Sequence, residues 1–119
     1  MKRILSLAAV LAVAATTVFA VTAYAGSSSA TGTSVKVTAK DNFRFTLSRT
    51  SAPHGKVSFV VTNKGRLKHD FAIAGKKTKM LGHNQSATLT VTLSKGKHQY
   101  KCTVPGHAAA GMKGTLTVR

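Results

Sequence analysis

Residues 102–112 read Cys102-Thr-Val-Pro-Gly-His107-Ala-Ala-Ala-Gly-Met112. The stretch brings a thiol, an imidazole and a thioether into one short segment, with four residues between each donor and the next. Pro105 fixes its own φ and Gly106 can adopt conformations closed to other residues, so the pair suits a sharp reversal. We therefore predict that a strand ends at Cys102 and that the chain doubles back, so that His107 can reach the same ion as the cysteine.

The donor types in this segment are those that suit copper. Two histidines and a cysteine in a trigonal set, with a long and weak bond to methionine, form the ligand set of blue-copper electron-transfer sites. A second histidine must then come from elsewhere, and the best candidate is His69, which opens the run His-Asp-Phe-Ala-Ile. The predicted metal ligands are thus His69, Cys102 and His107 in the trigonal plane and Met112 on the axis.

Outward from the segment, the chain alternates apolar and polar residues with period two, as half-buried strands do. No window after the first 25 residues shows a sustained helical period. With about seven to eight strands in fewer than a hundred residues, the sheets must pack face to face, so we predict an all-β antiparallel sandwich. The expected strands cover 35–40, 43–48, 57–62, 69–74, 87–93, 98–102 and 114–119, with a short edge piece at 80–81.

The C-x4-H-x4-M run, together with His69 upstream, resembles the cupredoxin family in its small plastocyanin-like and azurin-like members, over roughly Val35 to Arg119. The resemblance implies a Greek-key topology, one copper ion cycling between Cu(I) and Cu(II), and a one-electron carrier that is not an enzyme. It also implies an apolar patch around His107, where redox partners dock. This chain carries Asp70 where many cupredoxins carry an asparagine that braces the cysteine loop; an aspartate could still accept a backbone N–H from near Thr103, and its negative charge would lower the potential.

The N-terminal segment has the charge, apolar core and cleavage pattern of a secretory signal. Lys2 and Arg3 precede an apolar run, and Ala23-Tyr-Ala25 is a small-x-small site before Gly26. We predict a signal peptide over 1–25, a flexible linker over 26–34 and a copper-binding domain over 35–119. The protein is then periplasmic, secreted or held in the cell envelope. If the signal is retained, it becomes a membrane anchor, because its apolar run is long enough to span a bilayer.

The charge of the chain limits the classes of partner to expect, and its single cysteine limits the chemistry of the thiol. The chain has 18 Lys and Arg against 2 acids, Asp41 and Asp70, and its formal charge is +16. The basic residues are scattered rather than clustered, so nucleic acid is not expected as a partner. The charge either keeps the protein soluble or steers it toward an acidic partner, such as an acidic redox protein, an anionic lipid or a cell-wall polyanion. The expected partner is an acidic redox protein that docks near His107. A single cysteine cannot form an intramolecular disulfide, and as a metal ligand it would be a protected thiolate.

Other functions remain open at this point. Copper storage or delivery to an exported oxidase would favour exposed methionines, for which only Met80 is a candidate. A copper enzyme needs a second centre with further histidines, and the spare ones, His54, His83 and His98, show no clustered pattern. An adhesion module would not explain an unpaired Cys102. We expect the protein to be a monomer.

Overall fold

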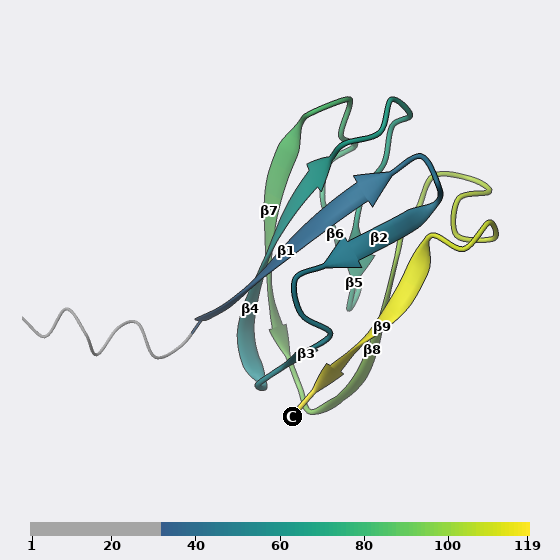
Figure 1. The fold of residues 1–119 in the computed structure, drawn as a ribbon. Helices are drawn as coiled ribbons and strands as arrows, with labels where there is room; N and C mark the ends of the chain where they lie inside the picture. Colours follow the sequence, from purple (N-terminus) through teal and green to yellow (C-terminus); the bar gives the residue numbers. More distant parts are fainter. Residues whose placement is uncertain (1–31) are drawn as a thin grey trace, which may run out of the picture.

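The computed structural model describes residues 32–119 (Figure 1). The predicted signal peptide or anchor and most of the predicted linker lie outside the described residues. Within 32–119, none of the structure is a helix with the length and apolar character needed to cross a bilayer. The strands are β1 (Gly32–Lys40), β2 (Arg44–Leu47), β3 (Ser51–Ala52), β4 (Gly55–Asn63), β5 (Ala72–Ile73), β6 (Lys76–Lys77), β7 (Ser86–Leu93), β8 (Gly96–Lys101) and β9 (Lys113–Val118).

The strands form two sheets that pack face to face, which confirms the predicted β-sandwich. One sheet has the order β2-β1-β4-β7 and the other β3-β9-β8-β5-β6. The chain crosses between them repeatedly, as the Greek-key resemblance implied. Pairing is not antiparallel throughout, however: β1 with β4 and β3 with β9 are parallel. Alternation alone could not have revealed this, because it shows which face of a strand is buried but not which strand lies beside it.

The apolar positions of these strands meet between the sheets. In β4, Val57, Phe59 and Val61 are fully buried and alternate with half-buried neighbours. They pack against Phe71 from the opposite side of the sandwich, and the Phe59 and Phe71 rings lie 5.1 Å apart. A second and smaller buried cluster, at the end of the sandwich that holds the loop after β8, contains Ala39, Cys102 and Met112.

The strand boundaries differ from the prediction in four places. β1 begins at Gly32, so the last residues of the predicted linker belong to the sheet. Phe43 was expected in a strand but lies in the β1–β2 turn with a φ of 57°. The predicted strand at 69–74 is reduced to β5, preceded by an isolated bridge between His69 and Leu81. β6 was expected to be a break, but a tight turn at Gly75 (φ 76°) pairs it with β5.

Candidate metal centre

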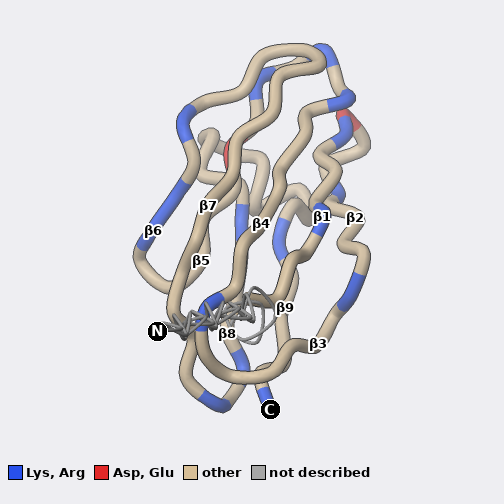
Figure 2. Tube along the Cα trace, turned by 90° about the vertical axis from the view of Figure 1, so that its left-hand side faces the viewer, with Lys and Arg blue, Asp and Glu red and all other residues tan. Residues whose placement is uncertain are grey.

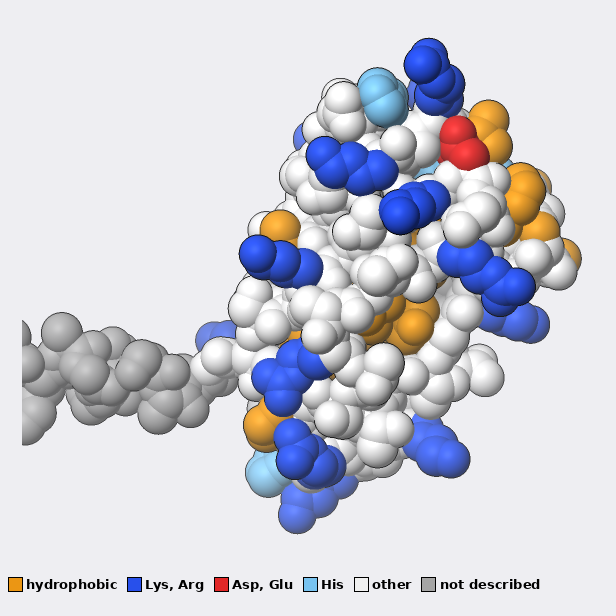
Figure 3. Space-filling model, viewed as in Figure 1, with side chains coloured by type: hydrophobic (Ala, Val, Ile, Leu, Met, Phe, Trp, Pro, Cys, Tyr) orange, Lys and Arg blue, Asp and Glu red, His pale blue; other side chains and the backbone are white. Residues whose placement is uncertain are grey.

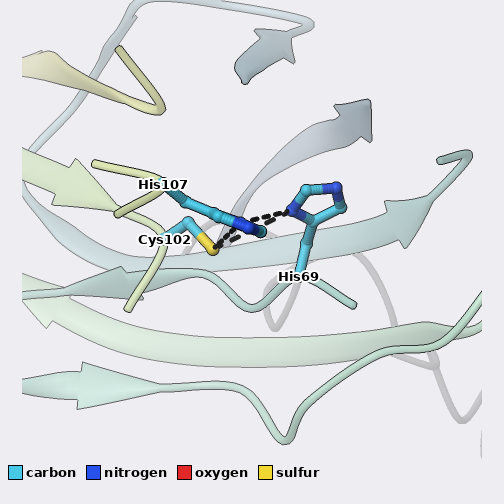
Figure 4. A group of neighbouring side chains, drawn as sticks. All are labelled: His69, Cys102 and His107. Carbon is cyan, nitrogen blue, oxygen red and sulfur yellow. Dashed lines mark hydrogen bonds between the residues drawn. The ribbon is translucent and has the colours of Figure 1, made fainter. Parts of the chain in front are cut away.

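Three of the predicted ligands, His69, Cys102 and His107, converge at one end of the sandwich (Figure 4). The two Nδ1 atoms of the histidines lie 3.2 Å apart. The Cys102 Sγ lies 3.6 Å from Nδ1 of His107 and 4.0 Å from Nδ1 of His69. Although 33 residues separate His69 from Cys102, the closed sandwich turns both side chains toward the same point.

The spacing of these three atoms suits a single metal ion. The point equidistant from them lies about 2.1 Å from each, close to typical metal–imidazole bonds of about 2.0–2.1 Å and metal–thiolate bonds of about 2.3 Å. One thiolate with two imidazoles is also a donor set of soft and borderline atoms that favours copper over hard cations. The residues therefore fit a type 1 copper site.

Backbone hydrogen bonds close the loop that carries two of these ligands. Cys102 follows the last residue of β8, and its N–H donates to the carbonyl of Met112 at 3.0 Å. The N–H of Met112 donates in turn to the carbonyl of His107 at 3.0 Å. Gly106 has a φ of 85°, which glycine adopts without strain. The predicted reversal at Pro105-Gly106 is therefore present, and it places His107 beside Cys102.

Met112, the predicted axial ligand, lies beside Cys102. Its side chain is fully buried in the small cluster that also contains Ala39 and Cys102, with Phe43 and Val104 packed around it. These apolar side chains keep water away from the Cys102 side of the site.

His69 is oriented by a residue that the sequence did not single out as part of the site. Its side chain is fully buried, and its Nε2 donates to Oδ1 of Asp41 at 3.1 Å. The Asp41 carboxylate also accepts the backbone N–H of Arg66 at 2.7 Å and of Leu67 at 3.1 Å. The backbone N–H of Arg66, followed by the hydrogen bond from His69, lowers the pKa of Asp41 below its usual value. The carboxylate is thus held ionised against the far side of the ligand.

The second acid, Asp70, braces the cysteine side. Its Oδ1 accepts the backbone N–H of Thr103 at 2.6 Å, and its Oδ2 accepts the Thr103 hydroxyl. Asp70 is itself almost fully buried. The expectation that an aspartate at this position could take over the bracing contact to the cysteine loop is met.

The other two ligands, His107 and Cys102, lie in apolar surroundings that shift their pKa values. His107 is half-buried and packs against the edge of the Phe43 ring, with ring centroids 5.1 Å apart. Burial, and then the neighbouring His69, lowers the pKa of His107, which favours the neutral imidazole that a metal needs. Burial raises the pKa of the Cys102 thiol, so a metal must displace its proton.

The remaining histidines stand apart from the site. His54 and His83 are exposed and bond to backbone carbonyls of Arg119 and Gly65, and His98 is half-buried and bonds to the carbonyl of Ser94. Sequence reasoning missed Asp41 and Phe43, since Asp41-Asn42 is also an ordinary turn dipeptide and Phe43 continues the alternation of the next strand. The one available signal was that the chain has only two acids.

Known proteins resemble the chain in both sequence and fold. Residues 24–119 match the family model described as copper binding proteins of the plastocyanin/azurin family. The copper-resistant cuproprotein CopI of Vibrio cholerae is 30% identical over 102 residues, covering 66% of this chain and 60% of CopI. Auracyanin-B of Chloroflexus aurantiacus is 52% identical over 42 residues, 34% of this chain and 18% of the relative. The chain therefore spans less than two thirds of the length of either relative.

A solved structure agrees on the fold. The dithionite-reduced auracyanin of Roseiflexus castenholzii superposes with a TM-score of 0.65 at 23% identity, covering 75% of this chain and 98% of that one. At this identity the likeness establishes the fold alone, and the identification of the metal as copper rests on the family match. With His69, Cys102 and His107 spaced for one copper ion, the chain belongs to the plastocyanin/azurin family of copper-binding proteins, the cupredoxins.

Proposed function

We propose that the protein is an exported one-electron carrier with a type 1 copper centre. The observation that carries the proposal is the convergence of two imidazole nitrogens and a thiol at distances that suit one ion. Copper bound there would supply the Cu(I)/Cu(II) couple. The protein's part is to hold the ligands in one arrangement for both oxidation states, so that little moves when an electron does.

Met112 is the proposed axial ligand. Its complete burial next to Cys102, and the hydrogen bond between the Cys102 N–H and its carbonyl, support this role. His107 is the proposed point of electron entry and exit, because it is the only half-exposed member of the group of three. Hydrophobic side chains gather at the upper right of Figure 3, over the loop that joins β8 to β9 in Figure 1. The proposed docking patch is Pro105, Gly106 and Ala108 to Ala110.

The test is to add Cu(II) to the purified protein and to record its visible absorption, electron spin resonance and voltammogram. We expect an intense thiolate-to-copper band and a reversible one-electron wave. Cys102→Ser should abolish the band, and His107→Gln should weaken or distort it. His54→Gln is the matched control, because this exposed histidine lies outside the group of three donors and its ring bonds to the carbonyl of Arg119. If the wild-type protein binds copper but shows no such band or no such wave, the proposed carrier function is wrong.

Copper storage or delivery is the second candidate, and two observations favour it. A relative is named a copper-resistant cuproprotein, and Met80 is one of the few large apolar side chains that is exposed in the described part of the chain. A delivery protein should lose Cu(I) readily to a chelator, and Met80→Leu should slow the transfer. A carrier should keep its copper through many redox cycles and should be indifferent to Met80→Leu.

An acidic redox protein is the proposed partner. In the part of the chain that the structure describes, Lys and Arg are spread from one end of the sandwich to the other (Figure 2), which would steer an acidic surface toward it. The rate of electron exchange with an acidic partner should fall as salt is raised, since the Debye length shrinks from about 10 Å at 0.1 M to about 3 Å at 1 M. Exchange with a basic protein of the same potential is the control. A rate that does not respond to salt would leave the charge with a role in solubility only.

Export and a monomeric state complete the proposal. Export is supported by the charged, apolar and small-residue pattern of 1–25, and it can be checked by N-terminal sequencing of the protein from its native cell envelope. A monomer is supported by the edge strand β6, whose two residues are exposed lysines, because charged edges oppose pairing between sheets. Light scattering of the copper-loaded protein measures the mass directly.

A further inference from the structure

Both acids of this strongly basic chain lie at the metal-binding end (Figure 2). Asp70 occupies the position where the family resemblance already led us to expect a brace. Asp41 has no such expectation attached to it. It lies in the turn after β1, 28 residues before His69 in sequence, yet its carboxylate contacts that ligand directly.

The contact defines which nitrogen of His69 carries the proton. An ionised carboxylate accepts hydrogen bonds and cannot donate them. The Asp41 Oδ1 at 3.1 Å from Nε2 therefore requires the Nε2–H tautomer, and the lone pair is left on Nδ1. That Nδ1 is the atom that faces Nδ1 of His107 and the Cys102 thiol. The ligand is thus prepared for a metal before one arrives.

The carboxylate is itself fixed by its surroundings. It accepts two backbone N–H groups from Arg66 and Leu67 as well as the imidazole N–H. Gly65 lies against it so closely that a Cβ at this position would overlap the carboxylate. By contrast, within residues 32–119 no hydrogen-bond partner lies on Nε2 of His107. The two histidine ligands are therefore supported unequally.

We infer that Asp41 is a positioning residue of the copper site, which locks His69 in the metal-binding tautomer and lowers the reduction potential. A carboxylate that accepts the outer N–H of a ligating histidine fixes the ring and makes the ligand more basic. Its negative charge also favours Cu(II) over Cu(I). The inference deepens the proposed function, because the potential matters only if the copper exchanges electrons.

The first experiment uses the wild-type protein without metal. Long-range proton–nitrogen NMR spectra at neutral pH distinguish the two tautomers of a histidine. We expect His69 in the Nε2–H form, with its Nδ1 accepting a hydrogen bond from Nδ1–H of His107. If His69 carries its proton on Nδ1, or is a mixture of the two tautomers, the inference is wrong. This measurement requires neither copper nor a variant, so it decides the question even if a substitution prevents folding.

The second experiment compares Asp41→Asn with Asp70→Asn, which remove the same charge from the two sides of the site. Asp41→Asn should weaken Cu(II) binding by about 10- to 100-fold and convert His69 to a mixture of tautomers. If Cu(I) binding weakens tenfold less than Cu(II) binding, the potential rises by about 59 mV. Asp70→Asn should leave the His69 tautomer as it is, because Asp70 contacts Thr103 instead.

Gly65→Ala separates position from charge. This variant keeps the Asp41 carboxylate, but the added Cβ occupies the space of that carboxylate. We therefore expect His69 to become a mixture of tautomers and Cu(II) binding to weaken, as in Asp41→Asn, at unchanged net charge. The inference is wrong if Asp41→Asn keeps the His69 tautomer, a Cu(II) affinity within twofold of the wild type and an unchanged reduction potential. In that case the blue band and the reversible wave of the wild type would still support the proposed carrier. If the wild type lacks that band or wave, the proposed carrier function is wrong, and the tautomer spectra still decide the role of Asp41.

Discussion

In the middle of the sandwich, four aromatic rings pack against one another, whereas the metal-binding end is built from hydrogen-bonded loops. The rings belong to Phe45, Phe59, Phe71 and Tyr100, with centroids 5.1–5.9 Å apart. At the metal end the buried groups include the polar side chains of Asn63, His69 and Asp70, beside the small apolar cluster of Ala39, Cys102 and Met112. Among the described residues, every buried side-chain nitrogen and oxygen has a partner.

The two regions divide the work of the molecule. Apolar packing is not directional and tolerates exchange of similar shapes, so the middle supplies stability. Hydrogen bonds fix direction, so the loops at the end can aim three donor atoms at one point. The comparison teaches that the ligand positions do not depend on the metal to be defined, because Asp41, Asp70 and Asn63 hold the loops that carry them.

The strongest way to break this division is Phe59→Ala. Phe59 is fully buried in the centre of β4, and deleting such a ring costs about 3–5 kcal/mol of unfolding free energy. We expect that loss in urea unfolding monitored by circular dichroism, with the blue band unchanged wherever the protein is still folded. Phe59→Leu is the control and should cost less than about 1.5 kcal/mol. A changed band in folded Phe59→Ala would mean that the two regions are coupled.

Asn63→Ala tests the other side of the comparison. The Asn63 side chain is fully buried; its Nδ2 donates to the carbonyls of Leu67 and Leu81, and its Oδ1 accepts the N–H of Gly65. Removing it leaves buried backbone groups without partners, at about 1–3 kcal/mol of unfolding free energy. Unlike Phe59→Ala, it should also weaken copper binding, measured by competition with a chelator. Unchanged affinity would show that this loop does not aim His69.

Counted per pH unit, the smallest effect expected is in the pH dependence of copper binding, which sharpens the picture of the site. Burial raises the pKa of Cys102, so at neutral pH the metal must displace the thiol proton. Copper affinity should therefore fall about tenfold for each pH unit below that pKa. The slope should steepen only below pH 6.5, since the pKa of His107 is lowered from that value. Affinity titrations from pH 5 to 8 measure both slopes; a flat profile would mean that the thiol is already ionised.

Most of the sandwich was predictable from local pattern. Alternation located β4, β7, β8 and β9 because one face of each is buried and the other wet. It failed at Phe43, whose side chain continues the alternation while its backbone turns, so that the ring reaches His107 instead of the next strand. It also failed at β6, where two exposed lysines carry no apolar signal.

By itself the sequence predicted the donor set, since Cys102, His107 and Met112 are local and their chemistry suits few ions. It also determined the strand-rich character of the chain. For His69, the sequence named the best candidate and the tertiary structure confirmed that it lies with Cys102 and His107. Only the tertiary structure decided that β1 and β4 run parallel and that Asp41 lies behind the ligand. The physical reason is that these are contacts between residues far apart in the chain, which depend on how two sheets pack and leave no periodic trace in the sequence.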